Sequence, residues 1–393
     1  MEIKGFKFSA VEAAVKKPGR LDLALILSET PAAVAAVYTT NRVKAAPVLL
    51  SMERTRNGHC QALVVNSGNA NACTGGQGMD DARETSRLVA EGLGIPDEAV
   101  LVSSTGVIGQ NLPMERIRRA VPPLVEGLSE GTLADLAAAI MTTDTFPKMA
   151  VREGKAAGIP YVIAGVAKGA GMIMPNMATM LAFMVTDAAV DPAWLQQVFR
   201  DANDASFNII SVDGDTSTND TSLIMANGAA GNIPIRPGTP EAARFAELLQ
   251  EVLLTLAKDI VRDGEGATKF VEITVTGAVS NAEAKQAAMA VANSCLVKTA
   301  FFGQDANWGR ILAAVGYSGA RVDQDRLSLR FDDVLIAQAG VFVGGDAEAR
   351  STAVLRKKEF AVTVDLRLGD GRATVYTSDL SYDYVKINAD YRT

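Results

Sequence analysis

The sequence predicts a mixed α/β protein of two packed domains or lobes, and three observations support this prediction. The chain has 393 residues, more than the roughly 100–200 residues usual for one domain. Hydrophobic residues make up 48% of the chain and charged residues 21%, an ordinary globular composition that can fill a sizeable core. Strand-like and helix-like stretches alternate along the whole length, which is typical of α/β proteins.

Strands are predicted where short apolar runs are bounded by turn residues. Four such runs are expected to be buried strands: 62–68, 99–104, 161–167 and 179–187. Nearer the C-terminus, segments 326–340 and 359–380 alternate apolar and polar residues, as half-solvated strands do. Within the second of these, LGDGR at 368–372 is predicted to be a hairpin turn. The order of the strands is not readable from these patterns.

Helices are predicted where apolar residues recur with helical spacing between start and stop signals. The clearest helix spans 239–264, with Pro240 in its first turn and Gly264 after its end. The same signals predict helices over 79–94, 191–204 and 282–294.

The charge balance disfavours nucleic acid as a partner. The chain carries 38 basic and 45 acidic residues, a net charge of −7, with no basic run, whereas phosphate binding needs clustered Lys and Arg.

Three scattered cysteines fit a reducing compartment. The N-terminal stretch has no apolar run that could serve as the core of a signal peptide. We therefore expect a cytoplasmic protein.

The segment 161–185 is long enough to cross a bilayer, since about 20 apolar residues suffice. Its glycines, Pro175, Asn176 and the central Lys168 are poorly suited to a lipid-exposed helix. The segment is therefore predicted to form two buried strands joined by a glycine-rich turn, and no membrane association is expected.

Several common catalytic chemistries lack the residues they need. His59 is the single histidine, and with no nucleophile motif beside it we expect a surface loop residue rather than a triad member. No Cys or His cluster is spaced for zinc, so no metal is expected. The glycine-rich stretches 106–110 and 264–269 match neither phosphate-binding loop pattern. The acidic segment 212–220 lacks the spacing of an EF-hand; a glycosidase-like carboxylate pair stays open, although no pair is nominated.

One nucleophile suits a sequence so poor in histidine and cysteine. A threonine at a chain N-terminus carries its own base, because the free α-amine titrates near pH 8 and lies within reach of the hydroxyl. Thr179 is an isolated hydroxyl in an apolar stretch and follows Ala178. An internal threonine gains the amine only when the peptide bond before it is cut. The stretch therefore raises the hypothesis of self-cleavage.

Segments along the whole chain resemble the arginine-biosynthesis ornithine acetyltransferases, also called glutamate N-acetyltransferases. The signature is KGAGMIMPNMATML at 168–181, within which this family cleaves itself between alanine and threonine. Ala170 and Met174 differ from the residues expected in many members, and neither is a position to which chemistry is assigned. The other matching stretches keep the family's order: 38–48, 64–75, 103–109, 140–148, 211–221, 263–270, 296–310 and 387–393.

The resemblance implies a self-processing N-terminal-threonine nucleophile fold with mixed sheets, packed helices and two lobes. Cleavage between Ala178 and Thr179 would leave an alpha chain, 1–178, and a beta chain, 179–393, assembled as two copies of each. The implied enzyme moves the acetyl group of N2-acetylornithine to glutamate through an acetyl-threonine intermediate, without a cofactor. Some members also use acetyl-CoA as a co-substrate, and the sequence leaves that point open.

The resemblance also assigns residues. Thr179 matches the nucleophile, and Thr105 with Gly106 matches the oxyanion hole. Lys168 would meet an anion such as the substrate carboxylate, because a lysine in so apolar a run is costly without one. Glu265 would hold the cationic end of ornithine. The full set of substrate-binding positions is Thr142, Lys168, Thr179, Glu265, Asn388 and Thr393. Without the resemblance, each of these except Thr179 would be interpreted as an ordinary turn, loop or surface residue.

Two other functions stay open at this stage. A related self-cleaving amidohydrolase or aminopeptidase would pass the acyl group to water. A non-catalytic metabolite-binding protein would keep the fold without cleaving itself. Formation of N-acetylglutamate on addition of glutamate separates the transferase from the hydrolase, whereas an uncut chain would favour the binding protein. The aspartates of 212–220 are left unassigned.

Overall fold

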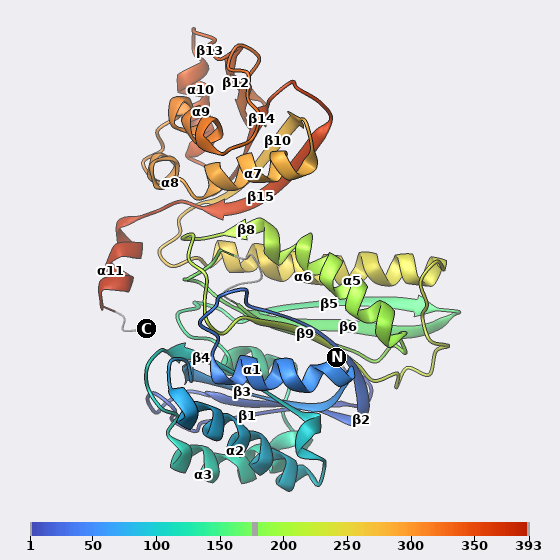
Figure 1. Ribbon diagram of the computed structural model, residues 1–393. Helices are drawn as coiled ribbons and strands as arrows, with labels where there is room; N and C mark the ends of the chain where they lie inside the picture. The colour runs from blue at the N-terminus through green and yellow to red at the C-terminus, as the bar shows by residue number, and fades with distance from the viewer. Residues whose placement is uncertain (1, 175–179, 391–393) are drawn as a thin grey trace.

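The computed structural model describes residues 2–174 and 180–390, which form two lobes, each built on one sheet (Figure 1). The sheet of the first lobe has the strand order β4-β3-β2-β9-β7-β6-β5, and β1 pairs with β2 outside this path. Its strands are β1 (Phe6–Val11), β2 (Leu23–Tyr38), β3 (His59–Asn69), β4 (Val100–Val107), β5 (Lys148–Ala156), β6 (Ile159–Lys168), β7 (Leu181–Thr186) and β9 (Thr221–Ala226).

The long strand β2 makes this sheet fold back on itself. Its first residues pair with β3 and its last six pair with β9, with a register shift between Leu27 and Ala32. The two halves face one another across a shared apolar core, in which Ile26 and Leu63 lie on one side and Phe183 on the other. The strand pairs are mixed, since β3–β4 and β7–β9 are parallel and the rest antiparallel.

Helices cover the outer faces of both halves, so the first lobe has four layers. Helices α2 and α3 cover the β3–β4 half, and α5 and α6 cover the half that contains β6, β7 and β9 (Figure 1). The helices are α1 (Ala46–Arg54), α2 (Gly75–Leu93), α3 (Met114–Glu126), α4 (Leu133–Ala139), α5 (Pro192–Asp204) and α6 (Pro240–Arg262), with short 3-10 turns at Thr55–Asn57, Asp97–Ala99, Gly127–Ser129 and Phe207–Ile209.

Helix α6 shows why the sequence signals predict these elements well. The Thr239 side chain accepts a hydrogen bond from the backbone N–H of Ala242 at 3.1 Å, Pro240 occupies the first turn, and Asp263 is the C-cap. One face of the helix is fully buried against β5 and β6, with Phe245 and Leu249 among its residues. The helix therefore begins and ends within two residues of the prediction.

The second lobe has a seven-stranded sheet in the order β13-β12-β11-β14-β10-β15-β8. Its strands are β8 (Ile210–Ser211), β10 (Phe270–Ala278), β11 (Ser328–Phe331), β12 (Val334–Gln338), β13 (Val341–Phe342), β14 (Glu359–Asp365) and β15 (Gly371–Ser378). Helices α7 (Asn281–Ala292), α8 (Cys295–Phe302), α9 (Trp308–Tyr317) and α10 (Ala347–Leu355) belong to the same lobe. The last helix, α11 (Tyr382–Asp390), leaves this lobe and returns beside the first one (Figure 1).

The hairpin predicted at LGDGR is wrong. Strands β14 and β15 flank this turn but do not pair with each other, because β10 lies between them, parallel to β14 and antiparallel to β15. The connecting segment crosses the end of β10, where the backbone N–H of Leu366 donates to the carbonyl of Thr276 at 2.9 Å. Strand β10 thus supplies the backbone partners that a hairpin would have supplied internally. The predicted α/β class, with mixed sheets, packed helices and two lobes, is confirmed.

The apolar segment 161–185 contributes two buried neighbouring strands, as predicted. Strands β6 and β7 pair antiparallel, from Ile163 opposite Thr186 to Lys168 opposite Leu181. In the part of the chain that the structure describes, no helix is both long and apolar enough to span a membrane. Because β6 precedes and β7 follows residues 175–179, a cut between Ala178 and Thr179 would leave two chains that share one sheet.

Candidate active site

A pocket of about 800 Å³, including its open mouth, lies where the ends of β4 and β6 meet helix α11. The pocket gathers every described residue that the resemblance assigned to chemistry or substrate: Thr105, Gly106, Thr142, Lys168, Glu265 and Asn388. The remaining three, Ala178, Thr179 and Thr393, lie outside the described residues.

The end of β4 places Thr105 and Gly106 in the pocket wall, where β4 runs parallel to β3. Gly106 has a φ of 133°, and a Cβ added there would lie 2.3 Å from the carbonyl carbon of Gly68. Only glycine allows so close an approach of the two strands. Next to it, Thr105 is buried, and its hydroxyl accepts a hydrogen bond from Lys168 at 3.0 Å.

Lys168, the last residue of β6, is only 7% exposed. Its ammonium donates to Thr105, and among the described residues no carboxylate lies within ion-pair distance of it. Burial lowers the pKa of Lys168, and the charges of Asp144 and Asp220 oppose that effect. A buried ammonium without an ion-pair partner is poised to bind an anionic ligand group.

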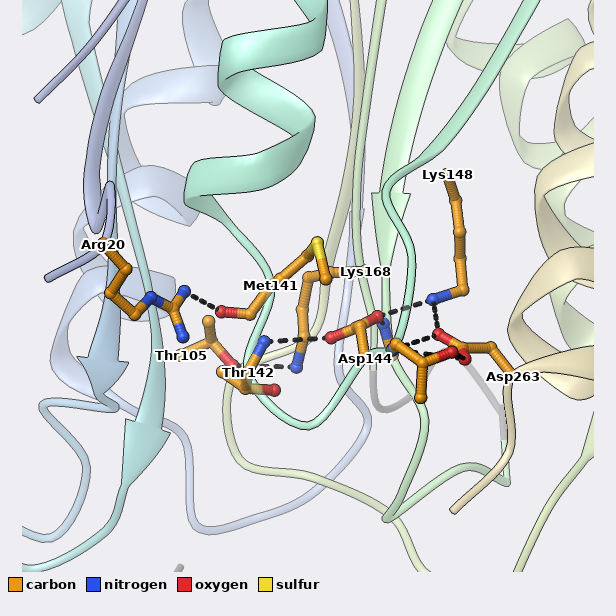
Figure 2. Close-up of polar contacts among 10 residues, drawn as sticks. Arg20, Thr105, Met141, Thr142, Asp144, Lys148, Lys168 and Asp263 are labelled. Atoms are coloured by element: carbon orange, nitrogen blue, oxygen red, sulfur yellow. Dashed lines mark hydrogen bonds and ion pairs between the residues drawn. The ribbon is translucent and has the colours of Figure 1, made fainter. Parts of the chain in front are cut away.

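Thr142 lies on the loop between α4 and β5, where hydrogen bonds hold the neighbouring residues Met141 and Thr142 (Figure 2). The backbone N–H of Thr142 donates to the Asp144 carboxylate at 2.9 Å. One residue earlier, the carbonyl of Met141 accepts a hydrogen bond from Arg20, which also donates to the Ser67 hydroxyl at 2.9 Å. The position of Thr142 in the pocket is therefore set by part-buried polar contacts rather than by regular secondary structure.

Glu265 and Asn388 meet across the pocket from the loop after α6 and from α11. The Asn388 side-chain amide donates to the Glu265 carboxylate at 2.7 Å. Gly171 makes room for this carboxylate, because a Cβ there would lie 2.4 Å from the Glu265 carboxyl carbon. The backbone N–H of Glu265 donates to the carbonyl of Ala170 at 2.8 Å. Ala170, one of the departures from the family pattern, takes part in this contact through its backbone, which any residue supplies.

The acidic segment 212–220, left unassigned from the sequence, forms another wall of the pocket. Asp213 accepts hydrogen bonds from the backbone N–H groups of Met172 and Ile173 at 2.6 and 2.8 Å, and Tyr384 of α11 donates to it at 3.2 Å. Burial and the charge of Asp213 raise the pKa of the Tyr384 hydroxyl. The carboxylates were visible in the sequence, but these partners lie far away along the chain and no local pattern points to them.

The charges of the pocket suit a ligand with both an anionic and a cationic end. Among its described lining residues, Lys168 is the only basic one, and four are acidic: Asp213, Asp215, Asp220 and Glu265. Within the described ranges, no group of three or more His, Cys, Asp or Glu is arranged to hold a metal ion. His59 is exposed in strand β3 rather than in a loop, and it is not among the pocket residues.

Comparison with known proteins agrees with this geometry. The sequence matches the ArgJ family over residues 7–393. Curated relatives from Geobacter sulfurreducens and Syntrophotalea carbinolica, both described as the arginine biosynthesis bifunctional protein ArgJ, are 75% and 56% identical over 393 residues and cover the whole of both chains. The crystal structure of an arginine biosynthesis bifunctional protein ArgJ from Bacillus halodurans is 43% identical, with a TM-score of 0.53 over 54% of this chain and 100% of that chain. The family match covers nearly the full length, and the Geobacter relative aligns with this chain from end to end. This chain therefore belongs to the ArgJ family.

Proposed function

We propose that this protein is an acyltransferase of arginine biosynthesis that moves the acetyl group of N2-acetylornithine to glutamate, with Thr179 as the nucleophile. Family membership supports this activity, since the relatives are named as arginine biosynthesis bifunctional proteins. The observation that supports it most is the single pocket into which six assigned residues converge from both lobes and from five separate segments of the chain.

Maturation creates the nucleophile. The Thr179 hydroxyl attacks the carbonyl carbon of Ala178, the C–N bond breaks, and the threonine nitrogen becomes a free amine. Water then hydrolyses the resulting ester and leaves a carboxylate on Ala178. The products are the chains 1–178 and 179–393, held together by the β6–β7 pairing described above.

Turnover then proceeds in two half-reactions, as nucleophilic catalysis allows. The α-amine of Thr179 takes the proton of its own hydroxyl as the oxygen attacks the acetyl carbonyl of N2-acetylornithine. The amide C–N bond breaks, ornithine leaves with that proton, and the acetyl group remains on Thr179 as an ester. The α-amine of glutamate attacks this ester, N-acetylglutamate is released, and the threonine hydroxyl regains a proton.

Each residue that the resemblance assigned has a role in this scheme. Thr105 and Gly106 stabilise the oxyanion of each tetrahedral intermediate, a contribution typically worth about 3–4 kcal/mol per donor at such sites. Lys168 and Thr142 bind the substrate α-carboxylate. Glu265, oriented by Asn388, binds the ammonium group of ornithine, and Thr393 completes the substrate site. This distribution of roles fits a pocket that is acidic except for one buried ammonium.

The word bifunctional in the names of the relatives supports a second acetyl donor, acetyl-CoA, for the same glutamate acceptor. The proposal includes no metal and no bound cofactor. It also includes a cytoplasmic location and an assembly of two alpha and two beta chains, as the family resemblance implies.

The proposal is tested with purified protein, N2-acetylornithine and ¹⁵N-labelled glutamate, by mass spectrometry of the products and of the intact protein. We expect labelled N-acetylglutamate, ornithine, and two polypeptides of 178 and 393 − 178 = 215 residues. Thr179→Ala should give one uncut chain and reduce transfer at least ~10⁴-fold, as loss of a covalent nucleophile does. A parallel reaction with acetyl-CoA in place of N2-acetylornithine tests the second donor.

Other products would contradict the proposal in distinguishable ways. Acetate without labelled N-acetylglutamate would identify a hydrolase of the same self-cleaving type. A folded, uncut wild-type chain that forms neither product would identify a metabolite-binding protein.

A further inference from the structure

Three buried charges lie directly behind the pocket wall and have no role in the scheme above. They form what we call the buried charge cluster: Asp144, Lys148 and Asp263 (Figure 2). The Lys148 ammonium lies 2.7 Å from an Asp144 oxygen and 2.5 Å from an Asp263 oxygen. The Lys148 and Asp144 side chains are fully buried, and that of Asp263 is 2% exposed. None of the three is among the pocket-lining residues.

Asp144 links two segments that carry substrate-binding residues. One carboxylate oxygen accepts the backbone N–H of Gly169 at 2.7 Å, and Gly169 directly follows Lys168 at the end of β6. The other oxygen accepts the backbone N–H of Thr142 at 2.9 Å. One carboxylate therefore fixes the Thr142 loop against the end of β6, and so sets the distance between Thr142 and Lys168.

Asp263 extends the same cluster to the loop that carries Glu265. It accepts hydrogen bonds from both the backbone N–H and the hydroxyl of Thr145, with N···O distances of 3.0 and 3.2 Å for the N–H. Glu265 follows two residues later and is held by its own backbone bond to Ala170. Lys148 thus joins Asp144, which holds Thr142 to the end of β6, with Asp263, which holds Thr145 of the same loop to the segment that carries Glu265.

Fold stability alone is a weak reason for such a cluster. Burying charges costs several kcal/mol per ion in desolvation, and replacing buried ion pairs by apolar residues of similar volume is often neutral or stabilising. A cluster of this kind is better explained by the geometry that it imposes. Here the charge-assisted hydrogen bonds of Asp144 end on the backbone of Thr142 and of Gly169, the residue after Lys168.

We infer that Asp144 is a positioning residue of the proposed acetyl transfer. It touches no substrate; it holds Thr142 and Lys168 in the arrangement that binds the substrate carboxylate, and its charge supports the charged form of Lys168. This inference rests on the proposed function, because it assigns a task within that site.

The charges around Lys168 give the inference a pH signature. The groups that act on the Lys168 ammonium are Asp144, Asp220 and Glu265, which favour its charged form, and Lys148, which opposes it. Burial lowers the pKa of Lys168, and the nearby ammonium groups hold the pKa of Asp144 below its ordinary value despite burial. Removing the charge of Asp144 would lower the pKa of Lys168 further. Substrate binding would then weaken at a lower pH than in the wild type.

The test compares Asp144→Asn with Asp187→Asn. Asp187 is a matched control because it is also buried and its carboxylate accepts a hydrogen bond from a backbone N–H of the same strand, β6, at 2.7 Å. The donor is Val162, six residues before Lys168 and near the other end of the strand. For each variant, kcat and KM for N2-acetylornithine are measured between pH 6 and 9.5, with urea unfolding and intact mass as checks of folding and cleavage.

We expect Asp144→Asn to lower kcat/KM about 10- to 100-fold, the size of effect that a misplaced binding group produces. Most of the loss should lie in KM, and the rise of KM with pH should begin at lower pH. Asp187→Asn should show wild-type kinetics whatever its urea midpoint. If Asp144→Asn does not fold, Asp144→Glu replaces it, since a longer carboxylate keeps its charge but not both backbone contacts.

The inference is overturned if folded, cleaved Asp144→Asn or Asp144→Glu has wild-type kcat and KM at every pH, or if its loss matches that of Asp187→Asn. Failure of the proposed function looks different, because the wild-type protein itself would then form no N-acetylglutamate.

Discussion

Lys148 and Lys298 are two of the buried lysines; they lie in different lobes, and their ammonium groups have opposite kinds of partner. Lys148 in the first lobe lies between two carboxylates, Asp144 and Asp263. Lys298 on α8 is 3% exposed, and its ammonium donates instead to the Thr377 hydroxyl at 2.9 Å and to the carbonyl of Ser378. Among the described residues, no carboxylate lies within ion-pair distance of Lys298.

The difference shows what each of these two lysines contributes to its surroundings. Burial lowers the pKa of Lys298 to about 8, because the more distant charges of Asp379 and Asp213 only partly oppose desolvation. Lys148 instead has two fixed counter-charges, and these hold the pocket loops. We therefore expect the first lobe to depend on an intact set of charges, and the second lobe to tolerate the loss of its charge.

The largest effect is expected for Lys148→Met, which leaves two carboxylates buried without their shared cation. Removing one partner of a buried ion pair typically costs about 3–5 kcal/mol. The free energy of unfolding should fall by that amount in urea titrations at pH 7. The measurement is best made in the Thr179→Ala background, where we expect one uncut chain and simpler unfolding.

A double variant separates charge from packing in this result. Lys148→Met combined with Asp263→Asn removes one of the stranded charges, so it should recover about 1 kcal/mol or more of the loss. If Lys148→Met alone costs less than about 1 kcal/mol, the two carboxylates do not depend on Lys148 and the contrast between the lobes fails.

A smaller effect on the free energy of unfolding, and one that depends on pH, is expected from the charge of Lys298. Its pKa is about 8 in the folded protein against an ordinary value of 10.5. Between these two pH values the unfolded chain keeps a proton that the folded chain has lost, so stability rises with pH. The difference in unfolding free energy between wild type and Lys298→Met should therefore grow by on the order of 2–3 kcal/mol from pH 7 to pH 10.5. A difference that stays flat over this range would show that the folded lysine titrates normally.

The sequence predicted which segments form strands and helices better than it predicted which strands lie side by side. Apolar periodicity and capping signals located β3, β4, β6 and α6, because these signals are local. The hairpin between β14 and β15 was wrong for the opposite reason. The partner of both strands, β10, is remote in sequence, and the alternating pattern of a strand carries no information on what lies beside it.

For the site, too, the sequence predicted some residues and missed others. The family resemblance nominated Thr105, Lys168 and Glu265, and all three line one pocket. It did not nominate the residues that hold them. Lys148 and Asp263 are separated by 115 positions. The rule that a buried lysine needs a polar partner says only that a partner must exist, and it does not say which residue supplies it. Which carboxylate fills that role is decided by the packing of β5 against α6, which no local pattern encodes.

The smallest effect is expected for Lys298→Met at neutral pH. At pH 7 this lysine is protonated in both the folded and the unfolded chain, so the folded protein bears the desolvation cost of the ammonium. Methionine removes that cost but leaves the Ser378 carbonyl and the Thr377 hydroxyl without this donor. Because Thr377 also donates to the carbonyl of Ala292 at 3.1 Å, its hydroxyl keeps a partner. The two contributions should nearly cancel, to a loss of no more than about 1 kcal/mol in urea unfolding at pH 7. A loss as large as that of Lys148→Met would mean that hydrogen bonds to neutral oxygens hold a buried lysine as firmly as two carboxylates do.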